Sequence, residues 1–338
     1  MDYVYKLNFL SYRMRLMFKA LSKTDFIKLL RERNVENIDL ISVVEKFLQK
    51  KRGFVLQKPK KKEPVILLLS GGLDSIVAWE TLIRWYDCIV YPVVISRGNW
   101  QRVHKESKSV RYFAKYFQRK YPDNYQEPFR MKVNTLPKDY SSYFTNIALS
   151  AEEILANFDA QRAYIKNGSN VLIRRENNID PYITSFYGVI YAQYLQNRFQ
   201  VKARHIFLGV NASDGISGSS QSFTALRSAL LSICAATANY DWNFSSVFFE
   251  KEFGLFLDKS AVVSLGAEFG LPMEKTWTCF KYGLWQCGDS CATCEDRRNA
   301  FSLAGVVDKT FYLSSFKALP SLFVRRLKNL VKSIIYKL

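Results

Sequence analysis

The stretch PVILLLSGGLDSIVAWETLIRW, residues 64–85, contains the turn around which the chain is organised. Residues 65–69 form a short apolar run rich in branched side chains, which predicts a buried strand. After the turn, apolar residues recur at helical spacing: Ile76, Val77, Leu82 and Ile83. A strand, two glycines and a helix start form an anion site, because the first N–H groups of a helix have no internal partner. We therefore expect a phosphate to bind there.

The turn itself reads SGGLDS, residues 70–75. Its two glycines let the backbone approach an anion closely, and its serines add hydroxyl donors. The loop is not that of kinases and GTPases, because it lacks the GxxxxGK[ST] lysine. It resembles the pyrophosphate (PP) loop of the ATP pyrophosphatase superfamily, whose members adenylate a substrate. The resemblance implies that ATP is bound by the whole turn, Ser70, Gly71, Gly72, Leu73, Asp74 and Ser75, with Asp74 also organising a Mg²⁺ ion. The alternative is a strand-to-helix turn without a ligand.

The composition describes a globular protein. The chain has 338 residues, 48% hydrophobic and 15% aromatic, enough for one large or two modest domains. The longest uncharged stretch, residues 181–197, contains Pro, Gly, Gln and Asn, so no membrane span is expected. Charged residues interrupt the first 15 residues, so no secretory signal is expected either. We expect a cytoplasmic location, where six cysteines favour metal binding over disulfides.

The net charge of +19 is concentrated at the two ends of the chain. Residues 1–62 contain 16 Lys or Arg and 6 Asp or Glu, and residues 309–338 contain 7 Lys or Arg and no acid. The ends therefore carry most of the attraction to anions. This charge favours contact with nucleic acid, an acidic protein partner or a membrane face. The alternative is a solubilising arm without a partner.

The remaining pattern predicts alternating strands and helices. Strands are expected at residues 88–94, 129–133 and 205–210, and helices at 110–117, 181–195, 224–237 and 260–269, with a polar loop at 98–106. Two short helices, broken at residues 34–37, are expected before a basic linker. The order predicts an α/β fold with a parallel sheet, helices on both faces, and a ligand crevice at the carboxyl ends of the strands.

Four cysteines lie within sixteen residues: Cys279, Cys287, Cys291 and Cys294. Four thiolates at this spacing can surround one tetrahedral ion, usually Zn²⁺, with Gly288 easing the turn between ligands. The spacing of the last three also matches that by which radical enzymes hold a [4Fe–4S] cluster. We expect a structural zinc site and keep the cluster as the alternative. The other two cysteines, Cys88 and Cys234, are expected in the core.

The chain has only two histidines, which argues against a Ser-His-Asp hydrolase. His205 heads an expected strand and is assigned a structural role, whereas His104 lies in the polar loop and its role stays open. Residues 319–338 place one apolar stripe along an expected helix. We expect this stripe to contact the body of the protein or a second copy in a homodimer, with binding to a membrane surface as the alternative.

Taken over about residues 64–301, the chain resembles the QueC-like family, the 7-cyano-7-deazaguanine synthases. The specific motifs are the PP loop and the cysteine cluster, and the weaker ones between them follow in the family's order. These weaker motifs are Gln101-Arg102 with His104 and Glu106, Gly209-Val210-Asn211 with Asp214 and Phe223, and Leu257-Asp258-Lys259. The resemblance implies that Gln101, Arg102, Gly209 and Asn211 bind ligand. It also places Lys259 near the phosphates and Asp214 in the crevice.

The resemblance implies an ATP-dependent carbon–nitrogen ligase. Family members adenylate the carboxylate of 7-carboxy-7-deazaguanine, let ammonia form the amide, and repeat the activation to reach the nitrile. AMP makes the carboxylate a reactive acyl donor, while the loop stabilises the departing pyrophosphate. The implied cofactors are ATP, Mg²⁺ and Zn²⁺. The implied catalytic residues are Asp74, Ser75, Asp214 and Lys259.

The sequence departs from the family pattern on the substrate side. Residues 217–223, SGSSQSF, lack the Asp and Arg of the corresponding family segment, residues 173–177 match the family's PxRN only in part, and one cysteine spacing is a residue longer. With the basic ends, this suggests a divergent relative that transfers the activated base to an amine of a macromolecular partner, in a modification or antiphage system. Two alternatives stay open. They are a tRNA-modifying PP-loop enzyme of thiolase or lysidine type, and a non-catalytic ATP-binding scaffold within a complex.

We therefore expect four regions in the chain. Residues 1–62 form a basic helical extension and linker, and residues 63–275 form the PP-loop ATP pyrophosphatase domain. Residues 276–301 form a four-cysteine zinc-binding lobe, and residues 302–338 form a basic amphipathic helical segment.

Overall fold

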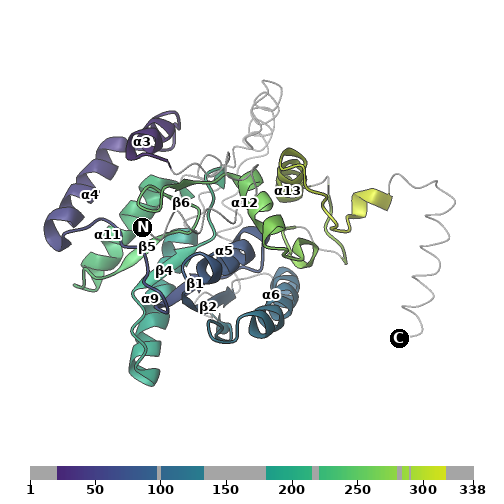
Figure 1. Ribbon diagram of the computed structural model, residues 1–338, viewed down its shortest axis with the longest axis horizontal. Helices are drawn as coiled ribbons and strands as arrows, with labels where there is room; N and C mark the ends of the chain where they lie inside the picture. The colour runs from purple at the N-terminus through teal and green to yellow at the C-terminus, as the bar shows by residue number, and fades with distance from the viewer. Residues whose placement is uncertain are drawn as a thin grey trace, which may run out of the picture.

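A five-stranded parallel sheet forms the centre of the protein (Figure 1). The computed structural model describes residues 21–96, 100–132, 180–214, 221–279, 284–288 and 291–316. The strands are β1 (Pro64–Leu68), β2 (Ile89–Ser96), β3 (Phe129–Lys132), β4 (His205–Leu208) and β5 (Asn243–Ser246). The predicted parallel α/β sheet is confirmed. The edge strand β5 was not predicted, because its sequence NFSS has only one apolar side chain although all four residues are buried.

The chain reverses its direction across the sheet at β1. The strand order is β3-β2-β1-β4-β5, so the chain moves outward from β1 to β3 and then returns to the other side of β1. Val65 of β1 pairs with Val90 of β2 on one side and with His205 of β4 on the other. At such a point the loops after the two neighbouring strands diverge and leave a crevice at the carboxyl ends. The SGGLDS turn follows β1 at this point.

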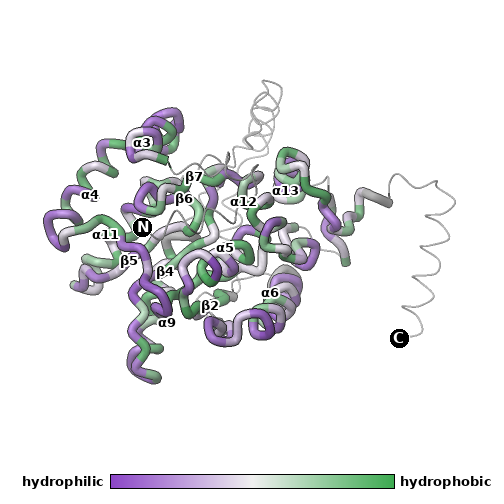
Figure 2. The backbone as a smooth tube through the Cα atoms, viewed as in Figure 1, coloured by the Kyte–Doolittle hydropathy of each residue, from purple (hydrophilic) through white to green (hydrophobic). Residues whose placement is uncertain are grey.

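Helices cover both faces of the sheet (Figure 1). One layer contains α5 (Leu73–Arg84), α6 (Trp100–Lys120) and α12 (Lys259–Glu268), and the other contains α9 (Asp180–Phe199) and α11 (Phe223–Ala236). In the first layer Trp79 of α5 contacts Phe117 of α6, with ring centroids 4.6 Å apart. Figure 2 shows hydrophobic residues gathered in the strands and in α5, and hydrophilic residues along the outer surface of α6. The core therefore lies between the sheet and these helices.

The predicted polar loop at residues 98–106 is wrong over most of its length, because α6 begins at Trp100. The polarity of the stretch belongs to the solvent-facing side of an amphipathic helix, whose other side buries Val110, Phe113 and Phe117. His104 is consequently an exposed helical residue.

Two N-terminal helices pack onto α11 and join the main core. They are α3 (Lys23–Arg31) and α4 (Ile38–Arg52), and they lie where two short helices were predicted. Ser22 and Asn37 cap them by accepting hydrogen bonds from the amides of Asp25 and Leu40. Phe26 of α3 contacts the ring of Phe223 in α11, with centroids 5.0 Å apart. The helices are therefore integral to the fold of the described residues.

A short hairpin and a C-terminal helix complete the described fold. The antiparallel strands β6 (Phe249–Glu250) and β7 (Leu255–Phe256) lead into α12, and the 3₁₀ turns η2 (Met273–Lys275) and η3 (Leu313–Phe316) flank α13 (Ala292–Leu303). Among the residues that the structure describes, no helix is long and apolar enough to cross a membrane. The expected apolar stripe at residues 319–338 lies outside the described residues, and the four-region division stays a prediction.

Arg227 of α11 is fully buried and joins α4 to the core through an ion cluster. Its guanidinium donates to Glu45 of α4 at 2.9 Å, to both oxygens of Glu250 at 3.0 and 2.7 Å, and to Glu252 at 3.0 Å. Burial raises the pKa of Glu250 to about 8, although the arginine opposes this. Arg227 thus compensates several carboxylates, and Lys251 pairs with Glu45 as well.

Replacing Arg227 by Leu should destabilise the protein strongly, because Glu250, which is fully buried, then loses the guanidinium that binds both of its oxygens. Removing one member of a buried ion pair costs about 3–5 kcal/mol, or on the order of 10 °C in Tm for a domain of this size. Thermal unfolding by circular dichroism measures this loss, and Lys46→Ala at an exposed position of α4 is the control. A loss in Arg227→Leu no larger than that in the control would contradict the assigned role.

Candidate functional site

The SGGLDS turn connects β1 to the first turn of α5. Gly71 has a φ of +80°, and a Cβ added there would lie 2.7 Å from the backbone oxygen of Glu106 in α6, so only glycine fits. Gly72 is the N-cap of α5, and no side chain caps the helix. The first N–H groups of α5 therefore remain available to an anion, at the end of the helix where the dipole is positive.

The two serines of the turn hold its shape. Ser75 Oγ donates to the Gly72 carbonyl at 3.0 Å and lies 3.0 Å from Ser70 Oγ, which accepts from the Gly72 amide at 3.2 Å. From outside the turn, Ser109 Oγ and the Trp277 amide both donate to the Gly71 carbonyl, at 2.7 and 3.2 Å. The turn is thus fixed from within and from two other segments of the chain. The ligand contacts expected of the serines stay predictions.

The carboxyl end of β4 lies directly against this turn. A Cβ added at Gly209 would be 2.8 Å from the backbone nitrogen of Ser75, so the approach needs a glycine. Two residues later, Asn211 is fully buried, and its Oδ1 accepts from the Ser213 amide at 2.9 Å. Its Nδ2 atom has no acceptor among the described residues. A buried amide donor without a partner indicates a place for a ligand acceptor.

Lys259 connects three chain segments at the mouth of the turn. It is the first residue of α12, it is 7% exposed, and its Nζ lies 3.1 Å from Asp74 Oδ2. The same Nζ lies 3.0 Å from Asp296 Oδ2 of α13. The predicted proximity of Lys259 to the turn is therefore found in the structure. The second carboxyl oxygen of Asp74, Oδ1, is buried and has no hydrogen-bond partner among the described residues.

Burial and neighbouring charges shift the pKa values of Asp214 and Lys259. Desolvation raises the pKa of Asp214 to about 7, Lys259 opposes this, and Asp74 adds to it. Desolvation acts to lower the pKa of Lys259, but the carboxylates of Asp74, Asp296 and Asp214 outweigh it and raise that pKa above its ordinary value. Lys259 is therefore a permanent cation. Asp214 Oδ2 also accepts from the backbone amide of Asn211 at 3.0 Å. The polar residues after β4 are thus linked to one another and, through the charge of Asp214, to Lys259 of α12.

Several predicted ligand-binding residues lie outside what the structure describes. Gln101 and Arg102 belong to α6, but their side chains are outside the described residues, as are residues 173–177 and most of residues 217–223. His205 is buried with Nε2 3.5 Å from Glu63 Oε1, consistent with its assigned structural role. A separate polar cavity of about 270 Å³ near the amino ends of β4 and β5, lined by Arg204 and Trp242 among others, contains none of the predicted site residues.

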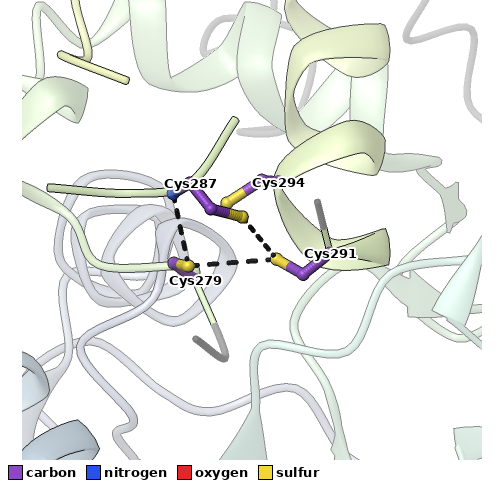
Figure 3. A group of neighbouring side chains, drawn as sticks. All are labelled: Cys279, Cys287, Cys291 and Cys294. Carbon is purple, nitrogen blue, oxygen red and sulfur yellow. Dashed lines mark hydrogen bonds between the residues drawn. The ribbon is translucent and has the colours of Figure 1, made fainter. Parts of the chain in front are cut away.

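The four cysteines come together at the start of α13 (Figure 3). Their Sγ atoms all lie within 4.8 Å of one another, with Cys287 and Cys279 at 3.3 and 3.9 Å from Cys291. Four sulfurs around one ion at about 2.3 Å would be separated by about 3.8 Å, which fits this arrangement. Hydrogen bonds to Cys279 and Cys291 raise the pKa of the Cys294 thiol, and burial adds to this, so four thiolates need a cation to coexist.

Arg297 anchors the cysteine cluster to the α/β body. Its fully buried guanidinium donates to the hydroxyls of Thr276 and Thr310 at 2.6 and 2.7 Å and to the Met273 carbonyl at 2.9 Å. Asp308 completes the group, with Oδ2 3.1 Å from Arg297 Nε. Because α13 carries both Cys294 and Asp296, the geometry of the metal-binding group also determines where Asp296 meets Lys259.

Sequence reasoning missed Asp296, Ser109 and Trp277. Asp296 had a usable signal, since it lies two residues after the last cysteine, on a helix that the cysteine cluster fixes. Ser109 and Trp277 had none. Their contacts with Gly71 join positions far apart in sequence, and neither residue type marks a phosphate loop.

The raised pKa of Asp214 makes stability depend on pH. The folded pKa of about 7 exceeds the unfolded value near 4, so the protonated carboxyl group favours the folded state. This contribution to the free energy of unfolding is complete below about pH 4 and is lost as pH rises to about 7. Asp214→Asn should therefore match wild type near pH 4 and exceed its Tm by a few degrees above pH 7. Thermal scans across this range test the sign, and a difference that does not grow with pH would refute it.

The sequence of the chain matches a known protein family over most of its length. Residues 64–305 match the sequence model described as "Queuosine biosynthesis protein QueC". The chain is 26% identical over 255 residues to the 7-cyano-7-deazaguanine synthase of Methanothrix thermoacetophila, covering 73% of this chain and 97% of the relative. It is 48% identical over 56 residues to that of Allorhizobium ampelinum, covering 17% of this chain and 23% of the relative. The chain thus spans about a quarter of the length of such bacterial relatives.

Among solved structures, the U34-tRNA thiolase NcsA from Methanococcus maripaludis with its [4Fe-4S] cluster aligns with 85% of this chain and 87% of its own. The TM-score is 0.30 and the identity is 12%, too low for a comparison of sites. The family match, by contrast, extends over most of the chain and includes the SGGLDS turn, Lys259 and all four cysteines. The chain therefore belongs to the QueC family of queuosine biosynthesis proteins.

Proposed function

We propose that the protein is an ATP-dependent ligase that adenylates the carboxylate of a 7-deazaguanine and releases pyrophosphate. The observation that carries this proposal is the contact between the buried ammonium of Lys259 and the carboxylate of Asp74. Asp74 lies in the first turn of α5. A cation close to uncapped helix N–H groups can stabilise a leaving group that gains negative charge during the reaction. Membership of the QueC family and the names of the relatives support the substrate class.

The proposed reaction uses the site in two steps. A carboxylate oxygen of the substrate attacks the α-phosphorus of ATP. The bond between the α-phosphorus and the oxygen that bridges to the β-phosphate breaks, and pyrophosphate leaves with the electron pair. The N–H groups of α5 and Lys259 stabilise that charge. Asp74 Oδ1, which has no partner among the described residues, is available to the Mg²⁺ that accompanies ATP. An amine then attacks the acyl carbon, AMP leaves with its electron pair, and the amine loses a proton.

The β4 end supplies the proposed substrate side. The Asn211 Nδ2 donor suits a carbonyl oxygen, and the Asp214 carboxyl group suits the N–H groups of a guanine-like edge. With ammonia as acceptor the product is the amide and, after a second activation, the nitrile. In the divergent form, the acceptor is an amine of a macromolecular partner drawn to the basic ends. Mass spectrometry of small molecules and partner after incubation with ATP distinguishes the two acceptors.

Removing the charge of Lys259 should reduce catalysis far more than substrate binding. Lys259→Met is expected to lower kcat for pyrophosphate release by about 10²–10³-fold, the usual loss when a group that stabilises transition-state charge is removed. Release from ATP and 7-carboxy-7-deazaguanine is the assay, with Lys202→Met, an exposed lysine before β4, as control. Turnover by Lys259→Met at the wild-type rate would remove the main support for the proposal.

We propose further that the cysteine cluster holds one structural Zn²⁺. Its sulfur separations suit a single ion, whereas thiolates bound to four different irons of a cluster would lie farther apart. The four positions leave no open site for chemistry at the metal. The role proposed for the cluster is to hold α13, and with it Asp296.

Metal analysis of purified protein should find about one zinc and no iron per chain. Cys287→Ser should lose the zinc and lower Tm, and it should also reduce turnover because α13 positions Asp296 against Lys259. Cys88→Ala, a buried cysteine outside the cluster, serves as control and should retain the metal. Iron with the visible absorption of an iron–sulfur cluster would overturn the assignment in favour of the cluster alternative.

A further inference from the structure

Arg33 is a buried arginine whose hydrogen-bonding groups are unused. It lies just after α3, it is 7% exposed, and none of its three nitrogen atoms has a hydrogen-bond partner among the described residues. A guanidinium has five N–H donors, and leaving such donors buried and unpaired is costly. Buried donors without an acceptor among the described residues indicate that a bound ligand supplies the acceptor.

The nearest carboxylate cannot satisfy these donors. Glu36 Oε1 lies 3.4 Å from Arg33 Nη1, an ion pair without a hydrogen bond. Both Glu36 oxygens instead cap α11: Oε1 accepts from the Phe223 amide at 3.0 Å, and Oε2 accepts from the amide and hydroxyl of Thr224 at 2.8 and 2.7 Å. Glu36 therefore balances the charge of Arg33 and leaves its N–H groups free to bind something else.

Two aromatic rings of the β6–β7 hairpin contact the guanidinium of Arg33. Its Cζ lies 4.9 Å from the ring centroid of Phe249 and 5.7 Å from that of Phe256. Phe256 lies three residues before Lys259, and the intervening Leu257 carbonyl accepts from the amide of Ala212, in the loop that carries Asn211 and Asp214. Asp214 in turn interacts electrostatically with Arg33 as well as with Lys259. The ring of Phe256 is thus tied through the neighbouring Leu257 to the loop that carries Asn211 and Asp214, and the charge of Asp214 acts on Arg33.

We propose that Arg33 is a substrate-binding residue that donates paired hydrogen bonds to the carboxylate of the acyl substrate. The assignment rests on the proposed function. A carboxylate presents two acceptor oxygens that match the guanidinium fork, and the contact with the rings of Phe249 and Phe256 orients that fork before binding. The N-terminal helices lie outside residues 64–305, which match the family, so this chain completes a shared site with a residue of its own.

The test compares two ligands that differ only in charge at the reacting group. Binding of 7-carboxy-7-deazaguanine and of its neutral carboxamide is measured by calorimetry, with the full chain saturated by a non-hydrolysable ATP analogue. Arg33→Gln should weaken binding of the carboxylate by about 10- to 100-fold and of the carboxamide by less than about threefold, since hydrogen bonds to charged groups are the stronger ones. Arg31→Gln, at the exposed last residue of α3, should change neither.

Arg33→Lys separates ligand binding from folding, because it keeps the ion pair with Glu36 and loses the fork. It should retain a near wild-type Tm and still weaken carboxylate binding at least about fivefold. Equal losses for both ligands, or a loss confined to the ATP analogue, would overturn the assignment of Arg33 alone. If wild type binds neither deazaguanine, the proposed function fails and the carboxylate assignment fails with it.

Discussion

The buried contact between Lys259 and Asp74 is the constraint on which the rest of the site depends. Lys259 begins α12, Asp74 lies in the first turn of α5, and Asp296 of α13 contacts the same ammonium from the other side. A cation excluded from water and held between two carboxylates has little freedom to move, so these three helix ends are fixed relative to one another. The same contact places a positive charge beside helix N–H groups that no side chain caps.

The cysteine cluster and the ATP turn are parts of one mechanical unit. Cys294 and Asp296 lie on the first turns of α13, while Arg297 ties that helix to residues 273–278. Trp277, in that same segment, donates through its amide to the Gly71 carbonyl. A metal in the cluster would thus influence the phosphate-binding turn from two directions without approaching the substrate.

The N-terminal helices contribute to more than solubility. Their apolar residues Phe26, Leu30 and Ile41 are buried in the main core, and Arg227 links α4 to the β6–β7 hairpin through Glu45 and Glu250. That hairpin also carries the rings under Arg33 and leads directly into Lys259. The segment that the family does not share is therefore joined to the shared site by the same short stretch of chain.

The sequence by itself determined the turn, the parallel order of most strands, the N-terminal helix pair and the cysteine group. Each of these rests on local periodicity or on fixed spacing between residues of strong chemical character, such as Gly71-Gly72 after an apolar run. Only the tertiary structure decided that polar NFSS is a buried strand, that α6 begins at Trp100, that Asp296 contacts Lys259, and that Arg33 is buried against two aromatic rings. These outcomes depend on contacts between residues far apart in the chain. Strand β5 pairs with β4, and Arg33 contacts rings more than 200 positions away, so no local pattern can record either.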